Sequence, residues 1–142
     1  MRKVSKIFLL VGGINAIICA FTFFVCAIIF FVGLNPVLLD AIKDALIQAG
    51  NPDPDVVITF ITVYAVLCGV LFIIFAALCV PSAVIAFKAQ KAEKPSKGLL
   101  IANIIFGYLS GSFYNFVGAI VGLIQNARED RKDKKAQIAD AQ

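Results

Sequence analysis

Few residues in this sequence have the types and spacings that could carry out chemistry. The chain contains no histidine, and its four cysteines include no CxxC pair, so no zinc-ligand spacing is present. No motif places a nucleophile beside a base or forms a phosphate-binding loop, and isolated residues such as Ser110 and Asp55 are typical of structural roles. We therefore expect no catalytic residue, no cofactor and no metal site, and we predict that the protein is not an enzyme.

The cysteines, Cys19, Cys26, Cys68 and Cys79, all lie inside long hydrophobic segments. A free thiol in such a segment packs as a small apolar side chain. Two alternatives stay open. Cys19 and Cys68 fall near the middles of antiparallel segments and could form a disulfide, and Cys79 could carry a lipid near the inner membrane surface.

The elements that must position these residues follow from the composition, which is 61% hydrophobic and 15% charged. The apolar residues form three blocks, at residues 7–34, 56–87 and 99–124, each longer than the roughly 20 residues that span a bilayer. Backbone groups in hydrocarbon need internal partners, and the blocks lack the alternation of barrel strands, so they should be helices. The sequence predicts an all-α integral membrane protein, a single membrane domain over residues 1–142 with three long transmembrane helices.

The N-terminus has the charge pattern of a signal peptide, because Arg2, Lys3 and Lys6 precede an apolar run. The run over residues 7–34 is longer than the roughly 7–15 residues of a secretory hydrophobic region, and no small-residue cleavage site follows it. We therefore expect a retained first transmembrane helix.

Between the first two blocks the sequence predicts a short amphipathic helix over residues 36–49. Asn35 can cap it, Pro36 suits its first position, and Gly50 and Asn51-Pro52 can end it. Its apolar face consists of Leu38, Leu39, Ile42 and Leu46. We expect an extracellular helix that lies flat, either resting on lipid headgroups and the spans beneath it or serving as a lid or docking element.

Pro81 lies late in the second block and should interrupt its backbone hydrogen bonds. Residues 56–80 already suffice to cross a membrane, which places Pro81 at the cytoplasmic edge. Two interpretations stay open, a simple helix end and a functional hinge.

Lysine and arginine near span ends are retained on the cytoplasmic side. Three basic residues precede the first block, the connection after it has only Lys43, and the next connection has four lysines, so we expect a cytoplasmic N-terminus. The net charge of +4 is thereby explained by topology, and no nucleic-acid partner is expected. Three crossings would place the C-terminus outside, yet the charged tail over residues 125–142, predicted to extend the third helix, is rich in Lys and Arg. On the cytoplasmic side the same residues could bind anionic lipid headgroups.

One solution is to break the third block at Ser110-Gly111-Ser112, which returns the tail to the cytoplasm. The other is a continuous third helix, which we favour from a stripe of small and amide residues on one helical face. The stripe consists of Asn103, Gly107, Gly111, Asn115, Gly118 and Gly122. Its two GxxxG pairs permit close helix packing in lipid, either within the chain or in a homo-oligomer or partner complex. Gly12, Ala16 and Ala20 form a weaker stripe in the first block.

The segment from Gly98 to Tyr108, followed by Gly118 to Ile124, resembles the closing part of small uncharacterised multi-pass membrane proteins of Gram-positive bacteria. The resemblance covers about a fifth of the chain. It implies a bacterial origin and no named activity. The location that we expect from the apolar blocks and their charged flanks is the plasma membrane.

No Asp, Glu, Lys, Arg or His lies inside a predicted span, which argues against a coupled transporter. We expect a non-enzymatic membrane protein that acts by helix packing, as an accessory or regulatory subunit or as a small homo-oligomer. One alternative is an oligomeric channel or small-solute transporter. Another is a bacteriocin or phage immunity protein that displays the helix at residues 36–49.

Overall fold

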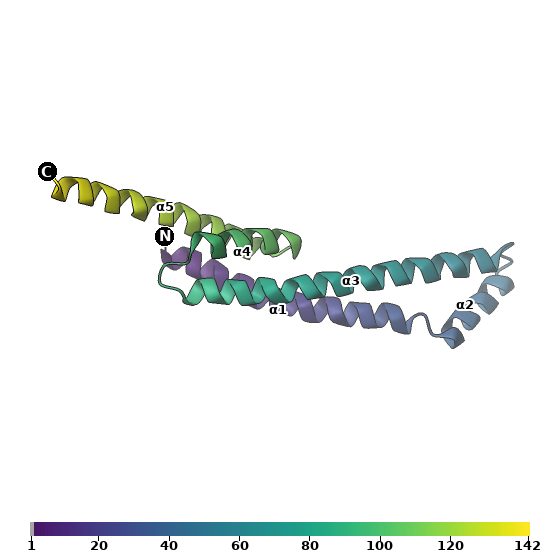
Figure 1. Ribbon diagram of the computed structural model, residues 1–142. Helices are drawn as coiled ribbons and strands as arrows, with labels where there is room; N and C mark the ends of the chain where they lie inside the picture. The colour runs from purple at the N-terminus through teal and green to yellow at the C-terminus, as the bar shows by residue number, and fades with distance from the viewer. Residues whose placement is uncertain (1) are drawn as a thin grey trace. The chain divides into compact units, whose positions relative to one another are not determined.

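The computed structural model describes residues 2–142, and within that range the chain is all-helical, with no β-strand. It forms five helices in the order α1 (Arg2–Val32), α2 (Pro36–Gln48), α3 (Pro54–Lys91), α4 (Lys97–Leu109) and α5 (Phe113–Asp140), shown in Figure 1. The helices group into two compact units. One contains residues 21–76, and the other contains residues 77–142 with the first 20 residues.

Two helices, α1 and α3, are long and apolar enough to cross a membrane, with 31 and 38 residues. Only 11% and 22% of their most apolar stretches are buried. The core helix of a water-soluble protein buries most of its apolar side chains, whereas Phe21 and Phe60 here are 70% and 71% exposed. The helices match the first two predicted blocks. α1 begins five residues earlier and ends two residues earlier than the predicted block at residues 7–34, and α3 extends beyond residues 56–87 at both ends.

Pro81 lies inside α3, and the helix continues beyond it to Lys91. The interpretation of Pro81 as a simple helix end is therefore wrong. The ring removes one backbone hydrogen bond without ending the helix, and Ser82 and Ala83 directly after it are buried.

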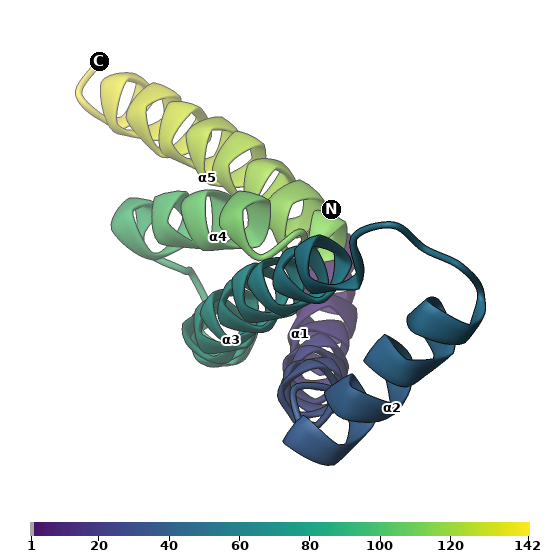
Figure 2. The same cartoon turned by 90° about the vertical axis from the view of Figure 1, so that its right-hand side faces the viewer.

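The unit at residues 21–76 contains α2 between the end of α1 and the start of α3 (Figures 1 and 2). Asn35 caps α2 by accepting a hydrogen bond from the Val37 amide at 3.0 Å. Gly50, with φ of +75°, ends it. The Gly50 amide donates to the Ile47 carbonyl and the Asn51 amide donates to the Leu46 carbonyl, each at 3.0 Å. These cap residues are the predicted ones, and the helix ends one residue earlier than expected.

The predicted apolar face of α2 is partly covered. Leu39, Ile42 and Leu46 are half-buried, whereas Leu38 remains 47% exposed. The Lys43 ammonium lies 2.6 Å from the Asp55 carboxylate at the start of α3. This hydrogen bond raises the pKa of Lys43, so the contact joins α2 to α3 at neutral pH.

The third apolar block is not one helix. The chain leaves the helical conformation at Ser110, Gly111 and Ser112, and α4 and α5 pack on each other as a hairpin. The preferred expectation of a continuous helix over residues 99–124 is therefore wrong, and the alternative break at Ser110-Gly111-Ser112 is the one observed. A buried core of Leu9, Ala89, Leu100 and Ala119 joins this hairpin to residues of α1 and α3.

Candidate functional site

The break between α4 and α5 is a glycine-centred helix end. Gly111 has φ of +69°, in the left-handed region that favours glycine. The Gly111 amide donates to the Tyr108 carbonyl at 3.2 Å, and the Ser112 amide donates to the Gly107 carbonyl at 2.8 Å. This pair of bonds is the Schellman pattern, which satisfies the last carbonyls of a helix. The Ser-Gly-Ser segment therefore stops α4 and starts α5 without leaving these backbone groups unpaired.

Buried polar side chains gather around this break. The Ser82 hydroxyl of α3 accepts hydrogen bonds from the Ser110 hydroxyl at 3.2 Å and from the Asn115 amide nitrogen at 3.0 Å. The Ser112 hydroxyl donates to the Gly12 carbonyl of α1 at 3.4 Å. Ser82 and Asn115 are fully buried, and Ser110 and Ser112 are at most 5% exposed. We call these four side chains the serine-asparagine cluster.

The Asn115 carboxamide oxygen has no hydrogen-bond partner. It lies 2.0 Å from the position that a Cβ atom on residue 12 would occupy. The oxygen therefore fills the space of the side chain that Gly12 lacks, in reach of a weak contact with the Cα hydrogen of Gly12. Because a buried unpaired acceptor costs about 1–3 kcal/mol, the close approach of α1 to α5 must offset that cost.

Asn103 on α4 has a similar arrangement. Its amide nitrogen donates to the Ile85 carbonyl of α3 at 3.3 Å and to the Leu99 carbonyl at 3.2 Å, while its oxygen is buried without a partner. The Ile85 carbonyl lies four residues after Pro81 in α3. Asn103 therefore ties α4 to the end of α3.

The other predicted packing residues divide by position. Gly107 faces α5, where an added Cβ would stand 3.0 Å from the backbone nitrogen of Phe116. Gly118 faces α1, because a Cβ added to it would stand 3.1 Å from atoms of Leu9. A Cβ added to Gly122 would stand 3.0 Å from Leu100 and from the Ser5 hydroxyl. The structure thus brings five of the six stripe residues into contacts within this unit.

Gly111 is the exception, because it is exposed in the turn and nothing lies within 4 Å of its Cβ position. Ser82, which lies in an apolar block next to Pro81, was not among the predicted site residues. Gly12 was predicted only as part of a weaker stripe. A small polar residue directly after a proline in an apolar helix was the available signal for Ser82.

At the other end of the hairpin, charged side chains connect the N-terminus, the α3–α4 connection and α5. Arg2 pairs with Glu129, and Lys94 and Lys97 lie 2.9 and 3.5 Å from Asp130. The hydrogen bond from Lys94 lowers the pKa of Asp130, and the same bond raises the pKa of Lys94. The pairing is lost only when pH falls through the lowered pKa of Asp130 or rises through the raised pKa of Lys94, so it persists at neutral pH.

Two buried hydrogen bonds reinforce this end. The Ser5 hydroxyl donates to the Gly118 carbonyl at 2.7 Å, and the Asn126 amide nitrogen donates to the Pro95 carbonyl at 2.8 Å. Together with the ion pairs, they hold the start of α1, the connection at residues 92–96 and the middle of α5 together.

The formal charges divide sharply between the two units. Twelve of the 13 Lys and Arg residues and five of the nine Asp and Glu residues lie in the unit that contains α4 and α5, a balance of +7. The remaining lysine and four aspartates lie at residues 21–76, a balance of −3.

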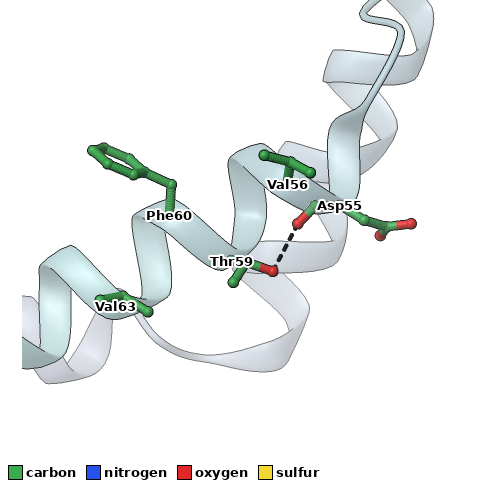
Figure 3. A pocket seen from close by; sticks show the side chains of 5 residues that line it. All are labelled: Asp55, Val56, Thr59, Phe60 and Val63. Atoms are coloured by element: carbon green, nitrogen blue, oxygen red, sulfur yellow. Dashed lines mark hydrogen bonds between the residues drawn. The ribbon is translucent and has the colours of Figure 1, made fainter.

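A surface hollow of about 440 Å³ along the start of α3 offers little polar chemistry. It is lined by Asp55, Val56, Thr59, Phe60 and Val63 (Figure 3). The Thr59 hydroxyl donates to the carbonyl of Asp55 in its own helix at 2.8 Å, so this donor is already used. Among residues 2–142, no group of three His, Cys, Asp or Glu side chains is placed to hold a metal ion.

The fold and the site define an all-helical protein with two helices able to cross a membrane and a closely packed helical hairpin whose turn carries two buried serines. No known protein family, curated protein or solved structure matches this chain.

Proposed function

We propose that the chain is a plasma-membrane protein that crosses the bilayer twice, through α1 and α3, with α4 and α5 forming a re-entrant hairpin that enters and leaves on the cytoplasmic side. The 13 residues of α4 rise only about 20 Å, and the apolar part of α5, residues 113–124, rises about 18 Å. Both are shorter than the roughly 30 Å hydrocarbon core. A hairpin of this length reaches into the membrane and returns.

The charge distribution supports this topology. With two crossings and a re-entrant hairpin, both termini and the α3–α4 connection, with the helix ends that flank it, lie on one side. These segments carry every Lys and Arg except Lys43. The opposite side then holds α2 and four aspartates. This arrangement agrees with the retention of basic residues in the cytoplasm, which three crossings would violate.

The contacts of the turn support the same proposal. Irregular backbone at membrane depth is tolerated only where protein or water covers it. Ser110 and Ser112 are buried, and their hydroxyls donate hydrogen bonds to Ser82 and to the Gly12 carbonyl. Gly111 between them is exposed, and its carbonyl accepts a hydrogen bond from the Phe113 amide at 3.1 Å. The two serines therefore meet that requirement through contacts with their own chain, and the Gly111 carbonyl has a backbone partner.

The topology can be tested with single cysteines at exposed positions, in a chain whose four native cysteines are replaced by alanine. We expect Ala49→Cys to react with a membrane-impermeant maleimide in intact cells. Ala136→Cys should react only after the membrane is permeabilised, a difference of at least tenfold in labelling. Equal labelling of both positions in intact cells would show a third crossing and defeat the re-entrant hairpin.

We propose that the protein is not an enzyme and acts as an accessory or regulatory subunit in the membrane. The observation that carries this proposal is the division of its surfaces. The glycine and asparagine edge packs against its own chain, while large apolar side chains of α1 and α3 are exposed. Contacts with a partner would then use the exposed sides of α1 and α3, and a homo-oligomer through the GxxxG edge is disfavoured.

A channel or small-solute transporter is the second candidate, because discontinuous helices with polar residues at the break occur in transport sites. The two proposals separate in liposomes. For an accessory subunit we expect ion and small-solute leakage from proteoliposomes equal to that of protein-free liposomes. Leakage above that level, reduced by Ser82→Ala, would replace the accessory role with transport.

Purification in mild detergent should also yield a complex of fixed stoichiometry, and recovery of monomer alone would contradict the accessory role.

A further inference from the structure

The polar half of α5, from Gln125 to Asp140, has two oppositely charged faces. At about 100° per residue, four of its five basic side chains fall within an arc of about 100°, and its acidic side chains fall within a similar arc on the opposite side. The basic face consists of Arg128, Arg131, Lys132 and Lys135. The acidic face consists of Glu129, Asp130, Asp133 and Asp140. Lys134 lies between the two faces.

The acidic face is turned toward the protein's own chain. It continues the edge of α5 that carries the buried residues Gly122 and Asn126, and Glu129 and Asp130 pair with Arg2, Lys94 and Lys97. The basic side chains are all exposed. Internal pairing thus neutralises part of the acidic face, and the exposed Arg131, Lys132 and Lys135 concentrate positive charge on the other face.

The basic face continues the outward apolar side of the hairpin. On α5, Phe113 and Ile124 lie in the same helical sector as the basic residues, and they are 68% and 46% exposed. In the topology proposed above, on which this inference rests, that sector faces lipid. The first basic residues beyond Ile124 follow it by about 6 to 12 Å of helix, which places them at or next to the headgroup layer.

A hollow of about 410 Å³ lies at the start of this face, lined by Gln125, Arg128, Glu129, Arg131 and Lys132. Guanidinium groups bind phosphate oxygens through paired hydrogen bonds, and lysine adds a point charge. From the charge, the lipid-facing sector and this hollow, we propose that the basic face of α5 binds the headgroups of anionic phospholipids in the cytoplasmic leaflet. An acidic soluble protein would have no reason to favour the side that continues the hydrocarbon-facing apolar row.

The test uses the full-length protein in detergent micelles with equal amounts of phosphatidylglycerol and phosphatidylcholine, and native mass spectrometry counts the retained lipids. We expect a preference for phosphatidylglycerol. Lys132→Gln should lower its relative association about fivefold, and Arg131→Gln with Lys132→Gln by more than tenfold. The matched control Lys134→Gln removes the same charge between the two faces and should lower it less than twofold.

Three results would overturn the proposal. Equal retention of the two lipids by the unmodified protein would show no anionic preference. Equal losses in Lys132→Gln and Lys134→Gln would show attraction to net charge without a binding face. Full competition by inorganic phosphate at the same concentration would indicate a site for a soluble anion. Because lipid retention in micelles does not depend on which side α5 occupies in a cell, failure here is distinct from failure of the cysteine-labelling test.

Discussion

Gly12→Ala is expected to destabilise the contact between α1 and α5 by about 1–3 kcal/mol, the usual cost of overpacking a closely packed core. The added Cβ would stand 2.0 Å from the Asn115 carboxamide oxygen and 2.7 Å from the Asn115 backbone nitrogen. The Asn115 side chain cannot move away freely, because its amide nitrogen donates a hydrogen bond to the buried Ser82 hydroxyl. The backbone of α5 would have to move as well. Reversible unfolding in a mixed detergent, followed by circular dichroism, measures the change.

Gly98→Ala is the matched control for this substitution. Gly98 lies in the first turn of α4, with nothing within 4 Å of its Cβ position. Alanine there should leave stability unchanged or raise it by up to about 1 kcal/mol, because it restricts the unfolded chain. If Gly12→Ala and Gly98→Ala unfold at the same denaturant concentration, α1 does not approach α5 as closely as described.

Substitutions at Gly107 and Gly111 are expected to differ in kind, although both belong to one GxxxG pair. Gly107→Leu would place its Cβ 3.0 Å from the Phe116 backbone nitrogen, with three further carbon atoms between α4 and α5. We expect a loss of about 3 kcal/mol or more and separation of the hairpin. For Gly111→Leu, no atom lies within 4 Å of the added Cβ. We expect a loss of stability of about 1–2 kcal/mol, because leucine is strained in the left-handed backbone conformation at this position.

Asparagine separates these two causes, because it adopts the left-handed conformation more readily than other residues. Gly111→Asn should recover most of the stability that Gly111→Leu loses, whereas Gly107→Asn should remain destabilised. The same unfolding measurement applies to all four variants. If asparagine lowers stability equally at both positions, residue 111 belongs to a continuous packed helix, and the chain does not break between α4 and α5.

Much of the local structure was predictable because it depends on neighbouring residues. The lengths of the first two apolar blocks predicted α1 and α3, and the signals at Asn35, Pro36 and Gly50 predicted the ends of α2. Each of these features arises from contacts a few residues apart, such as the Asn35 oxygen and the Val37 amide. The amphipathic pattern of α2 likewise identified Leu39, Ile42 and Leu46 as the covered side.

The candidate site was predictable only in part. The regular spacing of Asn103, Gly107, Asn115, Gly118 and Gly122 identified residues that are buried in close helix contacts. The same spacing suggested a continuous helix, because residues four apart share a face whether they belong to one helix or to two. Pattern alone does not distinguish a packing stripe along one helix from two stripes that face each other across a turn.

Sequence by itself determined that the chain is helical, that its first two apolar blocks are long enough to span a membrane and that basic residues gather away from α2. Only the tertiary structure decided that the chain turns back at Gly111. The partners that stabilise this turn are Ser82 and the Gly12 carbonyl, which lie 28 and 100 residues from the serines that bind them. Local spacing carries no information about contacts at such separations. The buried polar contacts of the turn therefore depend on the packing of α1, α3 and the hairpin.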